Sequence, residues 1–223
     1  MRTEEAYNQL QQTFEQTAGV YSSDRLMIAA HWREIVSAYS SEGRFYHTLS
    51  HLDNLLFQLS KVKEQTADWD TLLFSLFYHD IVYDATAPDN EEKSAELAVA
   101  RLNQIGFPQE RIAKCSAQIL ATKGHSVSED NDTNLFTDAD LSILGMPWED
   151  YAAYFGQVRN EYAVYPDELY NPGRTAVLKH FAAMPTLFKT PFFSSEFGRQ
   201  AEENIRKELA YYTENGNGFN SAG

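Results

Sequence analysis

Apolar residues recur at helical spacing along almost the whole chain. The sequence contains no pair of alternating apolar and polar runs joined by an Asn-Gly or Asp-Gly turn, the pattern that predicts a β-hairpin. The spacing therefore predicts an all-α fold. We expect the helices at about residues 3–17, 23–39, 48–62, 69–82, 90–105, 109–122, 147–162, 173–184 and 195–215.

The segments between the predicted helices are short, and no linker rich in Gly, Ser or Pro divides the chain. We therefore expect a single domain over residues 1–223, with a motif-bearing core at about 24–185 and the last predicted helix beyond it. Two polar stretches, 124–134 and 165–173, are predicted to be a mobile loop and a turn. The tail at 216–223 is expected to fray.

Composition narrows the classes of partner. The 223 residues include 18 Lys and Arg against 32 Asp and Glu, a formal charge of −14 that disfavours long nucleic acid. Cys115 is the single cysteine, so no intramolecular disulfide is expected and a reducing compartment fits. The N-terminus resembles no targeting signal, and the most apolar stretch, 72–82, is about half the roughly 20 residues of a membrane span. We expect a cytoplasmic protein without membrane binding; a homo-oligomer is compatible with the sequence.

Histidines and an aspartate in two places provide candidate chemistry. His47 and His51 are four residues apart, so both imidazoles share one face if this segment opens a helix. His79 and Asp80 stand in the middle of the most apolar predicted helix, where an ionised carboxylate needs a partner. Adjacent helical side chains diverge by about 100°, so this pair is expected to converge on a third object, for which a metal ion is the obvious candidate.

A third place adds oxygen donors. Asp138 is expected to cap the N-terminus of a helix, with Asp140 in its first turn as an available ligand. The candidate metal ligands are His51, His79, Asp80 and Asp140. This mixed imidazole and carboxylate set suits a divalent ion such as Mn, Fe, Co, Ni, Zn or Mg, and it leaves room for a water molecule that the metal acidifies.

The order of these residues resembles the metal-binding pattern of the HD superfamily of metal-dependent phosphohydrolases. The chain is most similar to a bacterial branch of predicted HD phosphohydrolases, with the motifs Arg-x-Tyr-His-x-x-x-His, His-Asp followed by Tyr-Asp, Asn-Glu-Glu, Ala-Thr-Lys-x-His and Asp-Ala-Asp-Leu. They lie here at 44–51, 79–84, 90–92, 121–125 and 138–141, and the resemblance covers about residues 44–174. A more distant similarity joins 46–51 to the Tyr-His-Asn-x-x-His motif of the cyclic nucleotide phosphodiesterases.

The resemblance implies an HD-domain-like helical bundle around a central metal site with one or two divalent ions. It implies that the four candidate ligands hold the metal, that Asp80 is also catalytic, and that His47 is the general acid. The implied reaction is hydrolysis of a phosphoester of a small metabolite or nucleotide by metal-activated water. After Asp80 this chain has Ile-Val-Tyr-Asp where the phosphodiesterases have His-Pro-Gly, a departure that affects the second metal and the nucleotide pocket of that family.

Other polar residues of the motifs are assigned around this centre. Arg44, Lys123 and His125 are expected to bind the substrate, because cationic side chains bind phosphate. The residues expected to surround the ligands are Asp84, Glu91, Glu92 and Asp138. Four of these assignments have a structural alternative: a helix start for Glu91 and Glu92, and a solvated loop for Lys123 and His125.

Two further functions stay open from the sequence. A di-iron oxygenase of HD type would need a second ligand set, drawn from Glu91, Glu92 or His125. A non-catalytic sensor or interaction module would keep the metal for stability alone.

Overall fold

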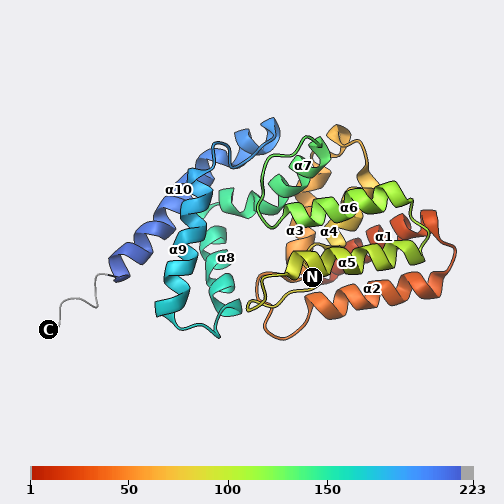
Figure 1. Cartoon of the computed structure of the whole chain (residues 1–223), viewed down its shortest axis with the longest axis horizontal. Coiled ribbons are helices and arrows are strands. Elements are labelled where there is room, and N and C mark those ends of the chain that lie inside the picture. The colour runs from red at the N-terminus through yellow and green to blue at the C-terminus, as the bar shows by residue number, and fades with distance from the viewer. Residues whose placement is uncertain (1, 217–223) are drawn as a thin grey trace. The chain divides into compact units, whose positions relative to one another are not determined.

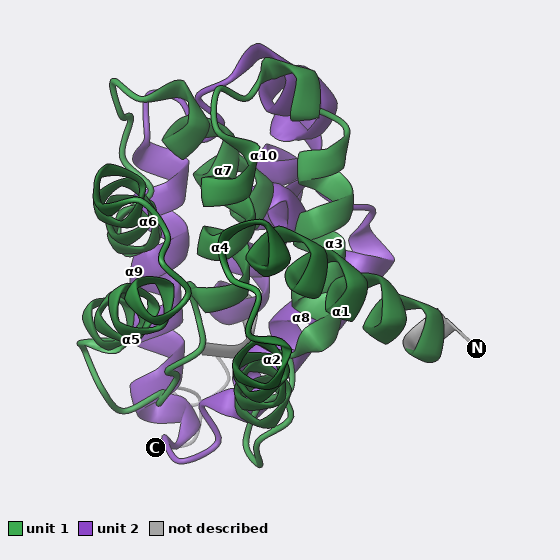
Figure 2. Ribbon diagram, turned by 90° about the vertical axis from the view of Figure 1, so that its right-hand side faces the viewer, with its two compact units in different colours: residues 1–140 green, residues 141–223 purple. Residues whose placement is uncertain are grey.

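The computed structural model describes residues 2–216, and their regular secondary structure is entirely helical (Figure 1). This confirms the predicted all-α fold. The chain divides into two compact units, residues 1–140 and 141–223, called unit 1 and unit 2 below (Figure 2). The single domain predicted over the whole chain stays a prediction. None of the described helices combines the length and the apolar character needed to cross a membrane.

Unit 1 is built around one apolar helix. Its elements are α1 (Arg2–Tyr21), α2 (Arg25–Tyr39), α3 (Leu49–Ser60), η1 (Lys63–Gln65), α4 (Trp69–Tyr78), α5 (Asn90–Gln104), α6 (Gln109–Ala121) and α7 (Asn131–Asp140). Every residue of α4 from Thr71 to Tyr78 is buried, and α1, α3, α5, α6 and α7 all contact this helix. A helix that is apolar on all sides is stable only when it is surrounded. Each fully buried Leu or Phe stabilises the fold by about 1.5–3 kcal/mol.

A polar cluster fixes the start of α4. Asp68 is the N-cap, accepts a hydrogen bond from the Thr71 amide and pairs with Arg111 of α6. The buried carboxylate of Asp132, on α7, accepts the backbone amides of residues 67 and 68 at 2.8 and 2.9 Å, and Lys114 donates to it at 2.7 Å. These bonds tie α4, α6 and α7 together, and two of these helices lead to the predicted metal ligands.

Unit 2 contains η2 (Leu141–Gly145), α8 (Trp148–Glu161), α9 (Asp167–Ala183) and α10 (Pro191–Gly216). A side chain at Gly145 would place its Cβ 2.8 Å from the Cα of Phe197, so only glycine permits this approach of η2 to α10. Asn204 of α10 donates hydrogen bonds to the carbonyls of Leu144 and Met146 at 2.9 and 2.7 Å. The segment that follows α7 is thereby held against the longest helix of unit 2.

Several predicted boundaries are wrong. Helix α9 begins at Asp167, within the turn predicted at 165–173, because Pro166 and two acidic residues favour a helix start and the helix accommodates Pro172. Helix α7 begins at Asn131, within the predicted loop at 124–134, and α10 begins four residues early. The tail predicted to fray lies outside the described residues beyond Gly216.

Candidate metal centre

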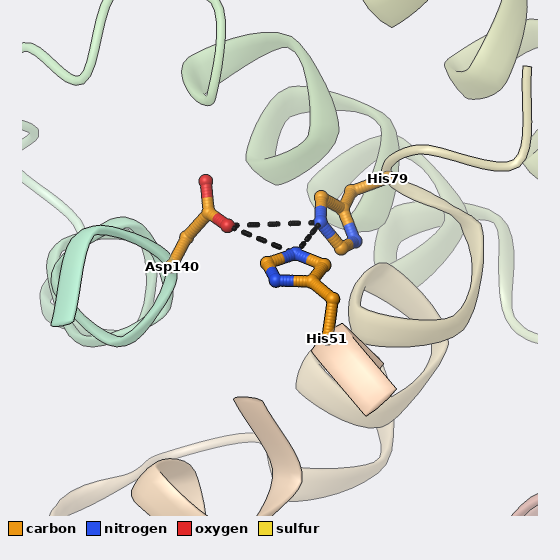
Figure 3. A group of neighbouring side chains, drawn as sticks. All are labelled: His51, His79 and Asp140. Atoms are coloured by element: carbon orange, nitrogen blue, oxygen red, sulfur yellow. Dashed lines mark hydrogen bonds and ion pairs between the residues drawn. The ribbon is translucent and has the colours of Figure 1, made fainter. Parts of the chain in front are cut away.

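Three side chains from three helices of unit 1 converge (Figure 3). His51 lies on α3, His79 is the C-cap of α4, and Asp140 is the last residue of α7. The two Nε2 atoms are 3.0 Å apart, and Asp140 Oδ1 lies 3.3 Å from that of His51 and 3.7 Å from that of His79. Donor atoms about 2.1 Å from one tetrahedral ion are about 3.4 Å apart, so this spacing fits a single metal ion.

Asp80 joins this group because α4 ends one residue before His79. The His79 amide still donates to the Ser75 carbonyl, but the Asp80 amide donates to the hydroxyl of Tyr39. The chain therefore leaves the helix at Asp80, whose Oδ2 comes to 3.0 Å from His79 Nε2. The prediction that the His-Asp pair lies in the middle of a helix is wrong, because α4 ends at Tyr78. Beyond the helix end the two side chains are not held about 100° apart and can approach each other. We call His51, His79, Asp80 and Asp140 the His/Asp cluster.

The two carboxylates also occupy different positions from those predicted. Asp138 and Asp140 close α7 instead of opening the next helix, and Asp138 is fully buried in the last turn. The expected N-cap at Asp138 is therefore wrong. Residues 141–145 form a 3-10 helix directly after α7, so no new α-helix begins there. Asp140 reaches the cluster from a helix C-terminus.

Hydrogen bonds orient both imidazoles. His79 Nδ1 lies 2.9 Å from the Leu76 carbonyl oxygen, which only accepts, so Nδ1 carries the hydrogen. In the neutral ring Nε2 then presents a lone pair to the cluster, as a metal ligand requires. His51 Nδ1 lies 3.2 Å from the Tyr46 hydroxyl, and its Nε2 faces the cluster as well.

The electrostatics of the cluster favour a cation. Burial raises the pKa of Asp80, but the imidazoles of His79 and His47 outweigh burial and hold this pKa far below its usual range. Burial lowers the pKa of His79, but Asp80 and Asp140 more than compensate and raise it to about 9. Burial dominates at His51 and lowers its pKa. Asp80 and Asp140, which are 18% and 14% exposed, thus stay ionised beside the positive charge of protonated His79. The donor chemistry of this set suits a divalent ion in place of that proton.

His47 stands at the more accessible side of the cluster. Its side chain is 20% exposed, and its Nε2 lies 3.8 Å from Asp80 Oδ2. The ring packs against Tyr83 with centroids 4.4 Å apart. The spacing predicts a shared helical face for His47 and His51 on the condition that this segment opens a helix. Helix α3 begins only at Leu49, so the condition is not met for His47. Both histidines nevertheless approach Asp80.

Arg44 lies beside the cluster and bonds to backbone. Its guanidinium donates to the carbonyls of His47, Asp80 and Ile81 at 3.1, 2.7 and 2.9 Å. It also lies over the ring of Tyr39, with the guanidinium carbon 4.9 Å from the ring centroid. We interpret Arg44 as a brace between the loop of His47 and the turn after His79. Its predicted contact with substrate stays a prediction.

The brace predicts a stability loss for Arg44→Lys. An ammonium cannot reach three carbonyls with the same geometry, and hydrogen bonds to charged groups contribute about 1.5–3 kcal/mol each, so we expect the free energy of unfolding to fall by about 2–4 kcal/mol. Urea denaturation measures this change. Arg33→Lys is the matched control, because Arg33 is exposed and, among the described residues, donates a hydrogen bond to the Ala29 carbonyl of its own helix alone. An equal loss in both variants would contradict the brace.

Four other predicted residues are not brought to the cluster. Lys123 donates to the Pro88 carbonyl at 2.7 Å and to Glu92 at 2.5 Å, and it lies 3.7 Å from Glu91. Asp84 accepts hydrogen bonds from the amide and hydroxyl of Thr86. No hydrogen bond or ion pair within residues 4–213 joins these four side chains to the cluster. His125, in contrast, does reach it: its Nε2 lies 3.0 Å from Asp140 Oδ2.

Sequence reasoning missed the tyrosines of the site. The Tyr39 hydroxyl accepts a hydrogen bond from the Asp80 amide. Tyr46 contacts His51, and the Tyr83 ring packs on His47. Tyr46 and Tyr83 lie inside the quoted motifs, which was the available signal. Tyr39 is the last residue of α2, on the buried face of that helix. Nothing in the local sequence indicates that its hydroxyl accepts a hydrogen bond from another segment.

Comparison with known proteins adds no relative: no family model, curated protein or solved structure matches this chain. The interpretation of the His/Asp cluster therefore rests on the geometry of unit 1 and on the motifs that supply its residues.

Proposed function

We propose that this chain is a metal-dependent phosphohydrolase of HD type that cleaves a phosphoester of a small metabolite or nucleotide. The observation that carries the proposal is the convergence of two buried imidazoles and two ionised carboxylates, from α3, the end of α4 and the end of α7, on one point. Their order along the chain resembles the metal-binding pattern of the HD superfamily. A divalent ion bound there supplies an acidified water molecule and neutralises charge on a phosphoryl oxygen.

The residues of the cluster would hold that ion through nitrogen and carboxylate oxygen atoms. His51 and His79 present Nε2, with the opposite ring nitrogens engaged by Tyr46 and by the Leu76 carbonyl. Such outer contacts fix the ring orientation and the tautomer of a metal-binding histidine. The carboxylates balance the charge of the ion, so the loaded site is near neutral within a buried environment.

His47 is suited to protonate the leaving oxygen. It is the histidine of the group with the largest exposed fraction, and Asp80 lies close enough to stabilise its protonated form. The Tyr83 ring limits the rotation of the imidazole, and Arg44 fixes the backbone of His47. A general acid held in this way acts on a substrate that enters from the same side.

The charge of the chain favours a small substrate. A formal charge of −14 opposes a long polyanion on the surface, whereas a bound divalent ion reverses the local charge at the cluster. Since Lys123 is paired with two glutamates and Arg44 with backbone, the ion is the main attraction for a phosphate. We therefore expect phosphomonoesters or small phosphodiesters as substrates.

His47→Ala tests this function. We expect the variant to retain its metal, measured by elemental analysis, and to lose about 10²- to 10⁴-fold in kcat on alkyl phosphoesters with Mn, Co, Ni or Mg. The loss on 4-nitrophenyl esters is expected to be much smaller, because 4-nitrophenolate leaves without a proton. His180→Ala, at an exposed histidine of α9, is the matched control.

Other outcomes would contradict the proposal and separate it from the two remaining functions. Hydrolysis absent with every metal, together with tight metal binding and a melting temperature that falls on chelation, would support a sensor or interaction module. Two iron ions per chain without phosphoester hydrolysis would support a di-iron oxygenase. An equal loss on both classes of ester would exclude His47 as the general acid.

A further inference from the structure

The backbone of His125 adopts a left-handed conformation, with φ of 50°. Within residues 2–216 it is the one non-glycine residue with positive φ. It follows the C-terminus of α6, and its amide donates to the Ala121 carbonyl at 2.9 Å. A turn that only had to end this helix would be formed at lower cost by glycine or asparagine. The unfavourable backbone at a histidine indicates a role for the side chain.

The imidazole of His125 reaches one oxygen of Asp140. Its Nε2 lies 3.0 Å from Asp140 Oδ2, and the ionised carboxylate can only accept, so the ring donates. The other oxygen, Oδ1, faces the Nε2 atoms of His51 and His79 at 3.3 and 3.7 Å. The two oxygens of one carboxylate are thus divided between two tasks.

We propose that His125 is a positioning residue that keeps Asp140 a monodentate metal ligand, by donating a hydrogen bond to the oxygen that does not face the metal. This inference rests on the metal site of the proposed function, but it does not depend on hydrolysis. Rotation of the carboxylate to present both oxygens to an ion would lengthen or bend the hydrogen bond from His125, so this bond favours binding through Oδ1 alone. His125 therefore acts through Asp140 and not as a ligand of the substrate.

Two observations on this contact support the assignment. His125 and Asp140 are 12% and 14% exposed, so water competes little for the hydrogen bond. The loop of His125 connects α6 to α7, so the contact also joins the two ends of the segment that delivers Asp140.

The test is the affinity of the full chain for Mn²⁺, measured by isothermal titration calorimetry with His125→Asn and His125→Gln. Asparagine tolerates the left-handed backbone, but its side chain is too short to reach Asp140. We expect Mn²⁺ binding about 10- to 100-fold weaker in His125→Asn, the usual effect of removing an outer partner of a metal ligand. Glutamine carries an amide nitrogen at about the distance of Nε2, so His125→Gln is expected to recover most of the affinity.

Readouts other than affinity separate positioning from a structural role. The melting temperature of metal-free His125→Asn should fall much less than that of the metal-bound form, because relief of the left-handed backbone offsets part of the lost hydrogen bond. With Co²⁺ as the probe, the visible absorption of His125→Asn should change in intensity while stoichiometry stays at one ion per chain. His180→Asn, at an exposed histidine of unit 2, should leave both the Mn²⁺ affinity and the Co²⁺ spectrum unchanged.

Three results would overturn the inference. They are an unchanged affinity in His125→Asn, a metal-free melting temperature that falls as much as the metal-bound one, and a stoichiometry that drops from two ions to one. The last result would make His125 a ligand of a second ion. A wild-type chain that binds no Mn²⁺ or Co²⁺ would instead overturn the metal site itself, whereas a chain that binds metal without hydrolysing any ester would overturn the proposed function alone.

Discussion

His79→Ala is expected to abolish binding of the divalent ion to this chain. The variant removes one of two imidazoles, and with it the nitrogen that lies within 3.0 Å of both His51 Nε2 and Asp80 Oδ2. Losing a ligand costs more than the about 10- to 100-fold in affinity that follows loss of an outer partner. At a free ion concentration 100-fold above Kd, the wild type gains about 2.7 kcal/mol in free energy of unfolding. The variant should gain none.

The matched control is His31→Ala. His31 is also a buried histidine of unit 1, and its Nε2 makes a 2.8 Å hydrogen bond with Gln104, which lies on α5. Both substitutions remove a buried ring and lower the stability of the metal-free protein. Only for His79→Ala should added Mn²⁺ leave the melting temperature unchanged. Elemental analysis should also find bound metal in His31→Ala and none in His79→Ala.

A second variant guards against loss of the fold. His79→Ala leaves the Asp80 carboxylate without its main partner, which is costly in a buried place. Asp140→Asn keeps the volume of the side chain and removes only its charge. This variant should therefore fold like the wild type, but its affinity for the ion should be much lower. Metal retained at full occupancy in both variants would contradict the His/Asp cluster as the binding site.

The sequence predicted the members of this cluster better than their local structure. Ligand types and their order identify His51, His79, Asp80 and Asp140, although the predicted end of the helix before His79 is wrong. Ile81 and Val82 continue the apolar pattern and predict a helix up to residue 82, whereas α4 ends at Tyr78 with His79 as its C-cap. Its true end is set by distant groups, the Tyr39 hydroxyl on the Asp80 amide and the Arg44 guanidinium on two carbonyls. Local spacing contains no information on such partners.

The same limit applies to the charged residues. An arginine or lysine in a motif shows that a hydrogen-bond donor is present, but it does not show which group accepts the hydrogen bond. Arg44 bonds to backbone carbonyls, and Lys123 pairs with the glutamates at the start of α5. His125 approaches the cluster because an uncommon backbone conformation turns its ring toward Asp140, and no sequence pattern predicts that φ.

The buried ion pair of unit 2 is expected to contribute strongly to the free energy of unfolding. Arg174 of α9 and Glu208 of α10 form two parallel hydrogen bonds of 2.8 and 3.0 Å, with exposed fractions of 7% and 0%. The hydroxyl of Tyr151 also donates to Glu208. Burial, followed by the charge of Glu208, raises the pKa of Tyr151, which therefore keeps its proton for this bond. The carboxylate depends on these partners because its side chain is fully buried.

Arg174→Met is expected to lower the free energy of unfolding by about 3–5 kcal/mol, because it leaves the Glu208 charge buried and uncompensated. The double variant Arg174→Met with Glu208→Leu removes both charges and should recover most of that loss, since well-packed apolar replacements of a buried pair are often neutral. Urea denaturation gives the free energies, and hydrogen exchange by mass spectrometry localises the loss to peptides of α9 and α10.

Arg199→Met supplies the matched control for this cycle. Arg199 and Glu203 form a pair of the same chemistry on α10, with the arginine 93% exposed, and such pairs contribute about 0–1 kcal/mol. Arg174→Met could lower the free energy of unfolding no more than Arg199→Met does. Glu208 would then be hydrated or protonated in the variant, and water would reach the interior of unit 2 despite its burial. If the double variant stayed as unstable as Arg174→Met, the loss would come from packing around the guanidinium, which also lies over Tyr154, and not from the orphaned charge. The cycle therefore separates electrostatic from packing stabilisation in a unit that contains none of the proposed metal ligands.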